Sequence, residues 1–203
     1  MKNFLSIDQG TTSSRSIIFD ANLNLVTDAQ EEYDLTYPED GWVELEPKKI
    51  IETVTNTLNK VVSADIGLEA CGITNQRETT IVWSKSTGEA IYPGIVWQDR
   101  RTHEYCSYLK SNGYESVIKE KTGLLLDPYF SATKIKWILD NVDGAREKAS
   151  KGELLFGTVD SYLIYMLSKE KNHFTDVTNA SRTLLFNIKS MEWDDELLEL
   201  FEI

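Results

Sequence analysis

The sequence is poor in cysteine and in basic residues. Its two cysteines, Cys71 and Cys106, have neither metal-binding nor redox spacing, so we expect both to be reduced side chains packed in the interior. Lysine and arginine number 21 against 33 aspartates and glutamates, and the net charge is −12. A nucleic-acid partner is not expected, because such a partner needs a basic stripe and the sequence has none.

Long apolar runs, internal repeats and low-complexity segments are absent as well. No run approaches the roughly 18 apolar residues that a membrane-spanning helix needs. The chain passes from Met-Lys-Asn directly into a strand-like run, without the pattern of a signal peptide. We therefore expect a cytoplasmic protein without a membrane span. At 203 residues the chain can form one large domain, or one domain with a small lobe, and no linker is evident.

A polar octet, Asp8-Gln-Gly-Thr-Thr-Ser-Ser-Arg15, lies between two short apolar runs at residues 4–7 and 17–19. Both runs are typical of strands, so the octet is predicted to be the turn of a hairpin. The octet is not a P-loop, because the chain contains no Gly-Lys-Ser/Thr. It also leads into a strand, whereas a P-loop leads into a helix.

The composition of the octet suits a bound phosphate group. Gly10 lets the backbone approach a ligand closely, and the hydroxyls of residues 11–14 and the guanidinium of Arg15 can donate to phosphate oxygens. Asp8 can hold a hydrated magnesium ion that bridges nucleotide phosphates. The alternative is an ordinary Ser/Thr-rich turn in which Asp8 accepts hydrogen bonds from turn amides.

Hydrophobic spacing predicts the remaining elements. A third strand over residues 24–33 completes a meander, and Pro47 begins a helix whose apolar residues lie on one face. Further strands are predicted at 69–74, 80–83, 95–97 and 154–156. Helices are predicted from about residue 103 to 109 and at 117–121, 131–141, 158–167 and 194–201, with a turn at 176–181. This order predicts an α/β fold with a layered sheet.

Arg77 and Glu78 follow the predicted strand at 69–74. An arginine donor beside a carboxylate acceptor in one turn suits a ligand whose neighbouring hydroxyls both donate and accept hydrogen bonds. A solvated surface pair is the alternative. Trp97 and Tyr129 lie near polar clusters, where an aromatic side chain can belong either to a binding site or to the core.

Seven segments together resemble a known family. They are Asp8-Gln-Gly-Thr-Thr-Ser-Ser-Arg15, Gly41-Trp-Val-Glu44, Thr74-Asn-Gln-Arg-Glu-Thr-Thr80, Val96-Trp-Gln98 with Arg100-Arg-Thr102, Asp127-Pro-Tyr-Phe-Ser131, Phe156-Gly-Thr-Val-Asp160 and Thr178-Asn-Ala-Ser-Arg182. In this order they resemble the signature segments of glycerol kinases, which are carbohydrate kinases of the actin-like ATPase superfamily. The Arg-Glu pair together with Asp-Pro-Tyr-Phe points to glycerol rather than a sugar.

The resemblance implies a ribonuclease-H-like mixed sheet flanked by helices, of which the chain carries the N-terminal domain only. It implies ATP-dependent phosphorylation of glycerol to sn-glycerol 3-phosphate. Arg77, Glu78 and Tyr129 would bind the glycerol hydroxyls, and Trp97 would contact the glycerol carbons. Asp8 would hold Mg²⁺ through water. The residues that would contact the nucleotide phosphates are Gly10, Thr11, Thr12, Ser13 and Arg15.

The resemblance also implies that parts of the active site of these kinases lie outside residues 1–203. The chain ends at Ile203, before the Gly-Asp-Gln segment with the catalytic aspartate of these kinases and before their second, adenosine-binding domain. We therefore expect the fragment alone to be inactive, and a homo-oligomer is also implied. Two alternatives remain: another polyol or pentulose kinase, with a differently sized pocket beside Arg77 and Glu78, and a non-catalytic actin-like module that binds nucleotide or metabolite.

Overall fold

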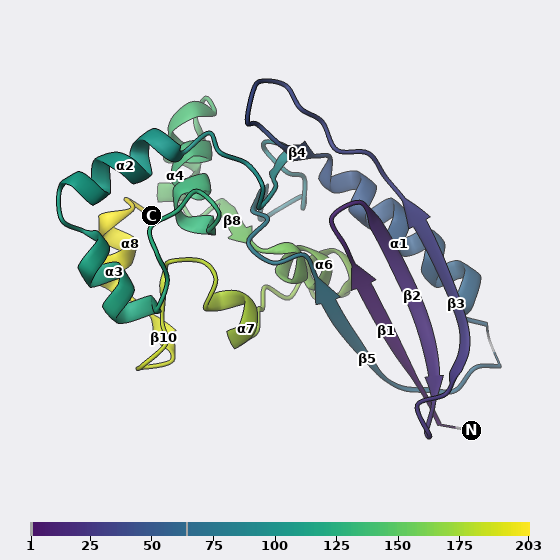
Figure 1. The fold of residues 1–203 in the computed structure, drawn as a ribbon. Helices are drawn as coiled ribbons and strands as arrows, with labels where there is room; N and C mark the ends of the chain where they lie inside the picture. The colour runs from purple at the N-terminus through teal and green to yellow at the C-terminus, as the bar shows by residue number, and fades with distance from the viewer. Residues whose placement is uncertain (1, 64) are drawn as a thin grey trace. The chain divides into compact units, whose positions relative to one another are not determined.

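The computed structural model describes residues 2–63 and 65–203, and this part of the chain forms two compact units. The first unit contains residues 2–35 and 45–76, and the second contains residues 36–44 and 77–203. The chain therefore leaves the first unit, contributes a short segment to the second, and returns to the first. Figure 1 labels many of the elements of both units along the chain.

The first unit is built on a four-stranded mixed sheet in the order β3-β2-β1-β5. Its strands are β1 (Asn3–Gln9), β2 (Ser13–Asp20), β3 (Leu25–Glu32) and β5 (Leu68–Asn75). β1, β2 and β3 are antiparallel neighbours, and β5 pairs in parallel with β1 after a crossover through helix α1 (Pro47–Val61). The predicted meander, the helix from Pro47 and the strand at 69–74 are confirmed.

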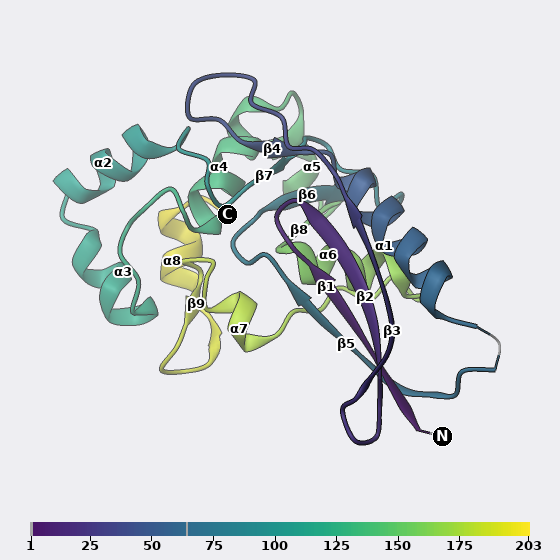
Figure 2. The same cartoon turned by 45° about the vertical axis from the view of Figure 1, so that its right-hand side comes forward.

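Helix α1 covers one face of this sheet (Figures 1 and 2). Helical spacing puts Ile50 and Val54 on its buried face, where neither keeps any exposed surface. A fully buried aliphatic side chain of this size contributes roughly 1.5–3 kcal/mol to the free energy of unfolding. The hydroxyls of Ser14 and Thr53 lie 2.8 Å apart across the same interface. The polar groups of this pair are thus buried with a hydrogen-bond partner.

The expectation of two buried cysteines is wrong for Cys71. Cys106 is buried in the second unit, but Cys71 is exposed on β5. The reason is the position of α1, which packs mainly against β2 and β3. Strand β5 is at the edge of the sheet and lies outside this cover.

The strands of the second unit form short separate pairs, whereas the sequence suggested one layered sheet. β6 (Ile81–Ser84) pairs antiparallel with β8 (Leu154–Gly157), and β9 (Phe186–Asn187) pairs antiparallel with β10 (Glu192–Trp193). The strand predicted at 95–97 is reduced to β7 (Gly94–Ile95), and β4 (Glu44–Leu45) is equally short. The mixed α/β class is confirmed, and its four-stranded sheet belongs to the first unit.

The other elements of the second unit are helices. They are α2 (His103–Ser111), α3 (Glu115–Thr122), α4 (Ser131–Asn141), α5 (Ala145–Ser150), α6 (Val159–Leu167), α7 (Val177–Ala180) and α8 (Asp195–Leu200). α4 matches its predicted bounds, whereas α5 has no predicted counterpart. The predicted turn at 176–181 contains α7, because the Asp176 carboxylate accepts the backbone N–H of Asn179 and caps a helical turn.

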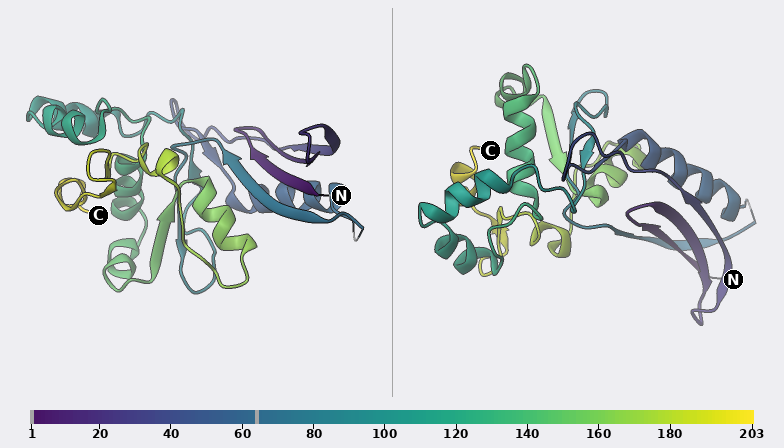
Figure 3. Two further views of the ribbon diagram at one scale, coloured as in Figure 1. Left: turned by 90° about the horizontal axis from the view of Figure 1, so that it is seen from below. Right: turned by 45° about the horizontal axis from the view of Figure 1, so that its top comes forward.

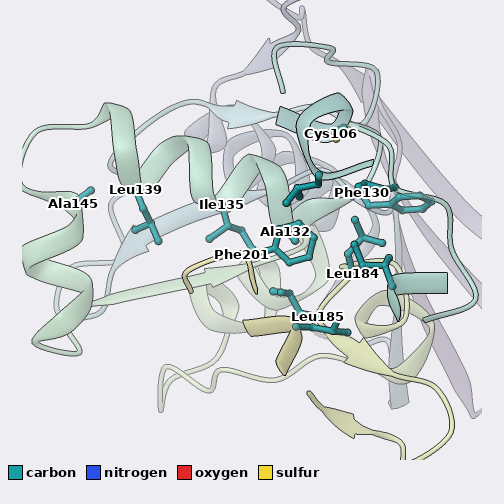
Figure 4. Close-up of a cluster of buried hydrophobic side chains, with 13 residues drawn as sticks. Cys106, Phe130, Ala132, Ile135, Leu139, Ala145, Leu184, Leu185 and Phe201 are labelled. Atoms are coloured by element: carbon teal, nitrogen blue, oxygen red, sulfur yellow. The ribbon is translucent and has the colours of Figure 1, made fainter. Parts of the chain in front are cut away.

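Helix α4 packs against the β6–β8 strand pair and also contributes to the main core of the second unit. Figure 3 shows β8 between α4 and α6. On α4, Ala132, Ile135 and Leu139 recur at helical spacing and join a core that includes Cys106, Leu184, Leu185 and Phe201 (Figure 4). Within residues 2–63 and 65–203, the helices are all too short or too polar to cross a membrane.

Candidate functional site

The hairpin loop of the first unit is tighter than the polar octet suggested. Strand pairing continues until Gln9 lies opposite Ser14, and the Gly10 N–H donates to the Ser13 carbonyl at 2.8 Å. The predicted hairpin is confirmed, and residues 10–12 alone connect its strands. Ser14, which the sequence placed among the loop hydroxyls, instead faces α1 and bonds Thr53. Three of the four predicted loop hydroxyls, those of residues 11–13, therefore remain at the loop.

The backbone of this loop is held by three side chains of the same unit. The Gly10 carbonyl accepts hydrogen bonds from Gln9 Nε2 at 2.7 Å, from the Tyr33 hydroxyl at 2.7 Å and from Gln76 Nε2 at 3.1 Å. Burial raises the pKa of Tyr33 to about 12, so its hydroxyl keeps the proton that it donates. The Tyr33 N–H also bonds the Thr12 carbonyl at 3.0 Å. These hydrogen bonds preorganise the loop.

The two charged residues of the octet lie opposite each other on neighbouring strands. Asp8 pairs in register with Arg15, and its side chain is exposed. Arg15 donates from Nε and Nη2 to Asp28 Oδ2, at 2.9 and 2.6 Å. The Arg15 guanidinium is thus directed to Asp28 on β3, and the sequence alone did not indicate this partner.

Arg77 and Glu78 lie in the turn that follows β5, and their side chains have different environments. Glu78 has a positive φ of 64°, which non-glycine residues rarely adopt, and the Thr79 N–H donates to the Arg77 carbonyl at 2.7 Å. The turn directs Glu78 inward, where it is 2% exposed, while Arg77 is exposed. The side-by-side arrangement that the sequence suggested is therefore replaced by one buried and one solvated side chain.

Arg182 connects the predicted substrate residues of the second unit. Its Nε lies 2.5 Å from Glu78 Oε1, and its guanidinium carbon lies 5.8 Å from the centre of the Tyr129 ring. The rings of Tyr129 and Trp97 are 5.5 Å apart. The structure thus brings Glu78, Tyr129 and Trp97 into one cluster. Sequence reasoning assigned no role to Arg182, although it closes the segment at 178–182 that carries the family resemblance.

The main chain beneath this cluster is held by a buried lysine. Lys134 of α4 is fully buried, and its Nζ donates to the carbonyls of Tyr129 at 2.5 Å and Glu78 at 3.4 Å. Burial lowers the pKa of Lys134 to about 7. Lysine 134 was not among the predicted site residues, because a lysine in a helical pattern usually lies at the surface.

Glu44, Asp99 and Arg101, from the segments 41–44 and 99–101, form a buried ionic cluster. The Arg101 side chain has no exposed surface, and it donates to Asp99 Oδ2 and Glu44 Oε1 at 2.8 Å each. Its guanidinium carbon lies 3.9 Å from the centre of the Trp42 ring. The Val43 N–H donates to Asp99 at 2.6 Å. These motifs therefore attach residues 36–44 to the rest of the second unit.

No cluster of three or more His, Cys, Asp or Glu side chains within residues 2–63 and 65–203 is arranged to hold a metal ion. The Asp8 carboxylate is the predicted ligand, and it is a single, exposed oxygen donor. Such a ligand fits magnesium, which keeps several waters and binds proteins through one or two carboxylates. It does not fit an ion that requires a full set of protein ligands.

Comparisons with known proteins agree with the resemblance. Residues 3–203 match the model of the FGGY family of carbohydrate kinases, N-terminal domain. The chain is 55% identical over 206 residues to a glycerol kinase of Haemophilus influenzae (strain PittGG) and 57% identical over 206 residues to one of Oceanobacillus iheyensis. Each match covers 100% of this chain and 41% of the relative.

A solved structure has the same fold. The crystal structure of Plasmodium falciparum glycerol kinase with ADP matches with a TM-score of 0.94 at 35% identity, over 100% of this chain and 41% of that one. The chain thus spans about two fifths of the length of these relatives, since 41% of each is covered. The predicted fold, that of the N-terminal domain of these kinases, is confirmed.

Proposed function

The chain belongs to the FGGY family of carbohydrate kinases, and from this membership we propose that the protein transfers the terminal phosphate of ATP to glycerol, giving sn-glycerol 3-phosphate. Glycerol kinases at 55% and 57% identity support glycerol as the acceptor. A relative whose structure contains ADP supports an adenine nucleotide as the donor.

The observation that carries this proposal is the cluster of Glu78, Tyr129 and Trp97 around Arg182. The Glu78 carboxylate, held by Arg182 at 2.5 Å, is an acceptor for the hydroxyls of a polyol. The exposed guanidinium of Arg77, the next residue in the chain, would supply a donor. The rings of Trp97 and Tyr129 would contact the C–H groups of glycerol. Together these residues would bind and orient the acceptor.

The hairpin loop of the first unit would bind the phosphates of the nucleotide. Its backbone is braced at Gly10, and the hydroxyls of Thr11, Thr12 and Ser13 lie at or beside the turn. Arg15 would share its guanidinium between Asp28 and a phosphate oxygen. Phosphoryl transfer depends mainly on such positioning and on neutralising charge on the oxygens.

Asp8 would hold a hydrated magnesium ion beside these phosphates. Its exposed carboxylate suits a cation that retains most of its water. When bound, the ion supplies positive charge to the phosphate oxygens. The use of ATP with this ion agrees with a cytoplasmic enzyme.

Substrate comparison tests the proposal. The full-length protein is assayed with ATP, Mg²⁺ and glycerol, D-xylulose or D-gluconate, and both ADP and the phosphorylated product are measured. The highest kcat/KM is expected for glycerol. A higher value for xylulose would favour a pentulose kinase. Binding of ATP without phosphorylation of any acceptor would favour a non-catalytic module.

A further inference from the structure

Lys134 is fully buried, and main-chain carbonyls surround its amino group. Its Nζ donates to the carbonyls of Tyr129 at 2.5 Å, Phe130 at 3.2 Å and Glu78 at 3.4 Å. Among the residues that the structure describes, no carboxylate lies within ion-pair distance of it. Burying an ammonium group without a counter-ion is unfavourable unless hydrogen bonds satisfy its three protons.

Glu78 is the residue whose main chain needs these hydrogen bonds. Its φ of 64° lies in the left-handed region, which is strained for a residue with a side chain. Its carbonyl accepts hydrogen bonds from Thr80 Oγ1 at 3.0 Å and Ser131 Oγ at 3.2 Å as well as from Lys134. Three side-chain donors on one carbonyl hold this peptide in a conformation that it would not otherwise keep.

The same lysine contacts the main chain of a second substrate residue. Tyr129 lies on the segment before α4, whereas Glu78 lies in the turn after β5, 56 residues from Lys134. The amino group of Lys134 therefore joins the two segments that present the carboxylate and the aromatic ring. Because Lys134 is fully buried, it has no surface with which to touch a substrate.

We propose that Lys134 is a positioning residue for the polyol site, which sets the placement of Glu78 relative to Tyr129 by binding the carbonyls of both. This inference rests on the proposed glycerol kinase activity. The carboxylate of Glu78 is oriented from the other side by Arg182. Lys134 holds the backbone of Glu78, and Arg182 holds its side chain. The Glu78 carboxylate would therefore keep a fixed orientation toward the polyol hydroxyl.

Lys134→Met tests this role, because methionine has a similar length and no donor. The matched control is Lys136→Met on the same helix, which removes a lysine that pairs with Asp140 at 2.9 Å and Glu202 at 3.0 Å. In the full-length protein, Lys134→Met is expected to raise the KM for glycerol by about tenfold or more, the size of losing one charge-assisted hydrogen bond. The KM for ATP should change less than twofold, and Lys136→Met should leave both constants unchanged.

Ser131→Ala is the second variant, in case Lys134→Met does not fold. It removes a weaker donor from the same Glu78 carbonyl and is expected to raise the glycerol KM by a few fold, again without effect on ATP. Equal changes in the glycerol and ATP constants, or a glycerol KM within twofold of wild type in folded Lys134→Met, would overturn the proposal. If the wild-type protein does not phosphorylate glycerol, the proposed function itself is wrong. This outcome is distinguishable from failure of the Lys134 proposal, because it is seen without any substitution.

Discussion

Glu78 Oε1 and Arg182 Nε are 2.5 Å apart although the two residues are separated by 104 positions in the sequence. The Glu78 side chain is 3% exposed and that of Arg182 is 25% exposed. A carboxylate buried to this extent requires a charged or hydrogen-bonding partner, and Arg182 is that partner. The guanidinium of Arg182 in turn lies near the ring of Tyr129. Four predictions concern these residues and the elements that support them, and a fifth concerns the nucleotide loop.

Glu78→Gln is expected to lower kcat/KM for glycerol about ten- to hundredfold, because a charge-assisted hydrogen bond of ~1.5 to 3 kcal/mol becomes a neutral one. Steady-state kinetics of the full-length protein with glycerol as the varied substrate measure it. Glu89→Gln, at an exposed position of the same unit, is the control and should behave as wild type. An unchanged kcat/KM in Glu78→Gln would remove Glu78 from the site.

Arg182→Met is expected to reduce both stability and glycerol use, because it leaves the Glu78 carboxylate buried without its partner. Removing one member of a buried pair costs about 3–5 kcal/mol, and the partial exposure of Arg182 puts the expected loss below that range. Denaturant unfolding and glycerol kinetics measure the two effects. Arg146→Met, which breaks a more exposed pair with Asp140, should affect neither by more than a small amount. Wild-type glycerol kinetics in Arg182→Met would contradict its role.

Gly10→Ala is expected to weaken ATP use with little loss of stability. A Cβ at Gly10 would meet the Ser13 carbonyl at 3.4 Å and the Ser13 Oγ at 3.8 Å, which are ordinary contacts. The added methyl group would, however, occupy space where the backbone approaches a phosphate. ATP titration and thermal melts distinguish these effects. Gly72→Ala is the control in the same unit, since a Cβ there meets nothing within 4 Å. Normal ATP binding and turnover in Gly10→Ala would identify the loop as a plain turn.

Arg101→Met is expected to destabilise the protein by about 3–5 kcal/mol, because the Asp99 and Glu44 carboxylates would stay buried without their cation. The neighbouring Arg100 is the control. It forms an exposed pair with Asp127, so Arg100→Met should cost no more than ~1 kcal/mol. Chemical denaturation of both variants gives the comparison. Equal losses would show that burial does not distinguish the two pairs.

The stability of the protein should rise with pH through Lys134. Burial lowers the pKa of Lys134 from 10.5 to about 7, so between these values the unfolded chain binds a proton that the folded chain lacks. The resulting stability is fully present above pH 10.5 and is lost as pH falls toward 7, with a slope of at most about 1.4 kcal/mol per pH unit.

The difference in unfolding free energy between wild type and Lys134→Met is measured as a function of pH. It isolates the contribution of Lys134, because the contributions of the other titrating groups cancel. The charged and titratable groups that face Lys134 are Asp99, Glu78, Cys106 and Asp127. Burial raises the pKa of Cys106 to about 11, and hydrogen bonds from Tyr129 and Arg100 outweigh burial and lower the pKa of Asp127. A difference that stays constant from pH 7 to 10 would show that Lys134 keeps its ordinary pKa.

The sequence by itself determined the elements whose patterns are local. Short apolar runs predicted the meander, helical spacing predicted α1 and both ends of α4, and the turn between β1 and β2 followed from its polar composition. Two short helices, α5 and α7, escaped prediction. Helix α7 depends on a single cap at Asp176, and α5 is only 6 residues long.

The tertiary structure alone decided which polar side chains meet. A left-handed backbone at Glu78 turned that residue inward and left Arg77 in solvent, which no spacing rule predicts. Arg15 was expected at a phosphate but bonds Asp28 on the next strand. The partners Arg182 and Lys134 reach Glu78 from 104 and 56 residues away. Local periodicity records which face of an element is buried, whereas the partner of a buried charge depends on how distant elements pack against each other.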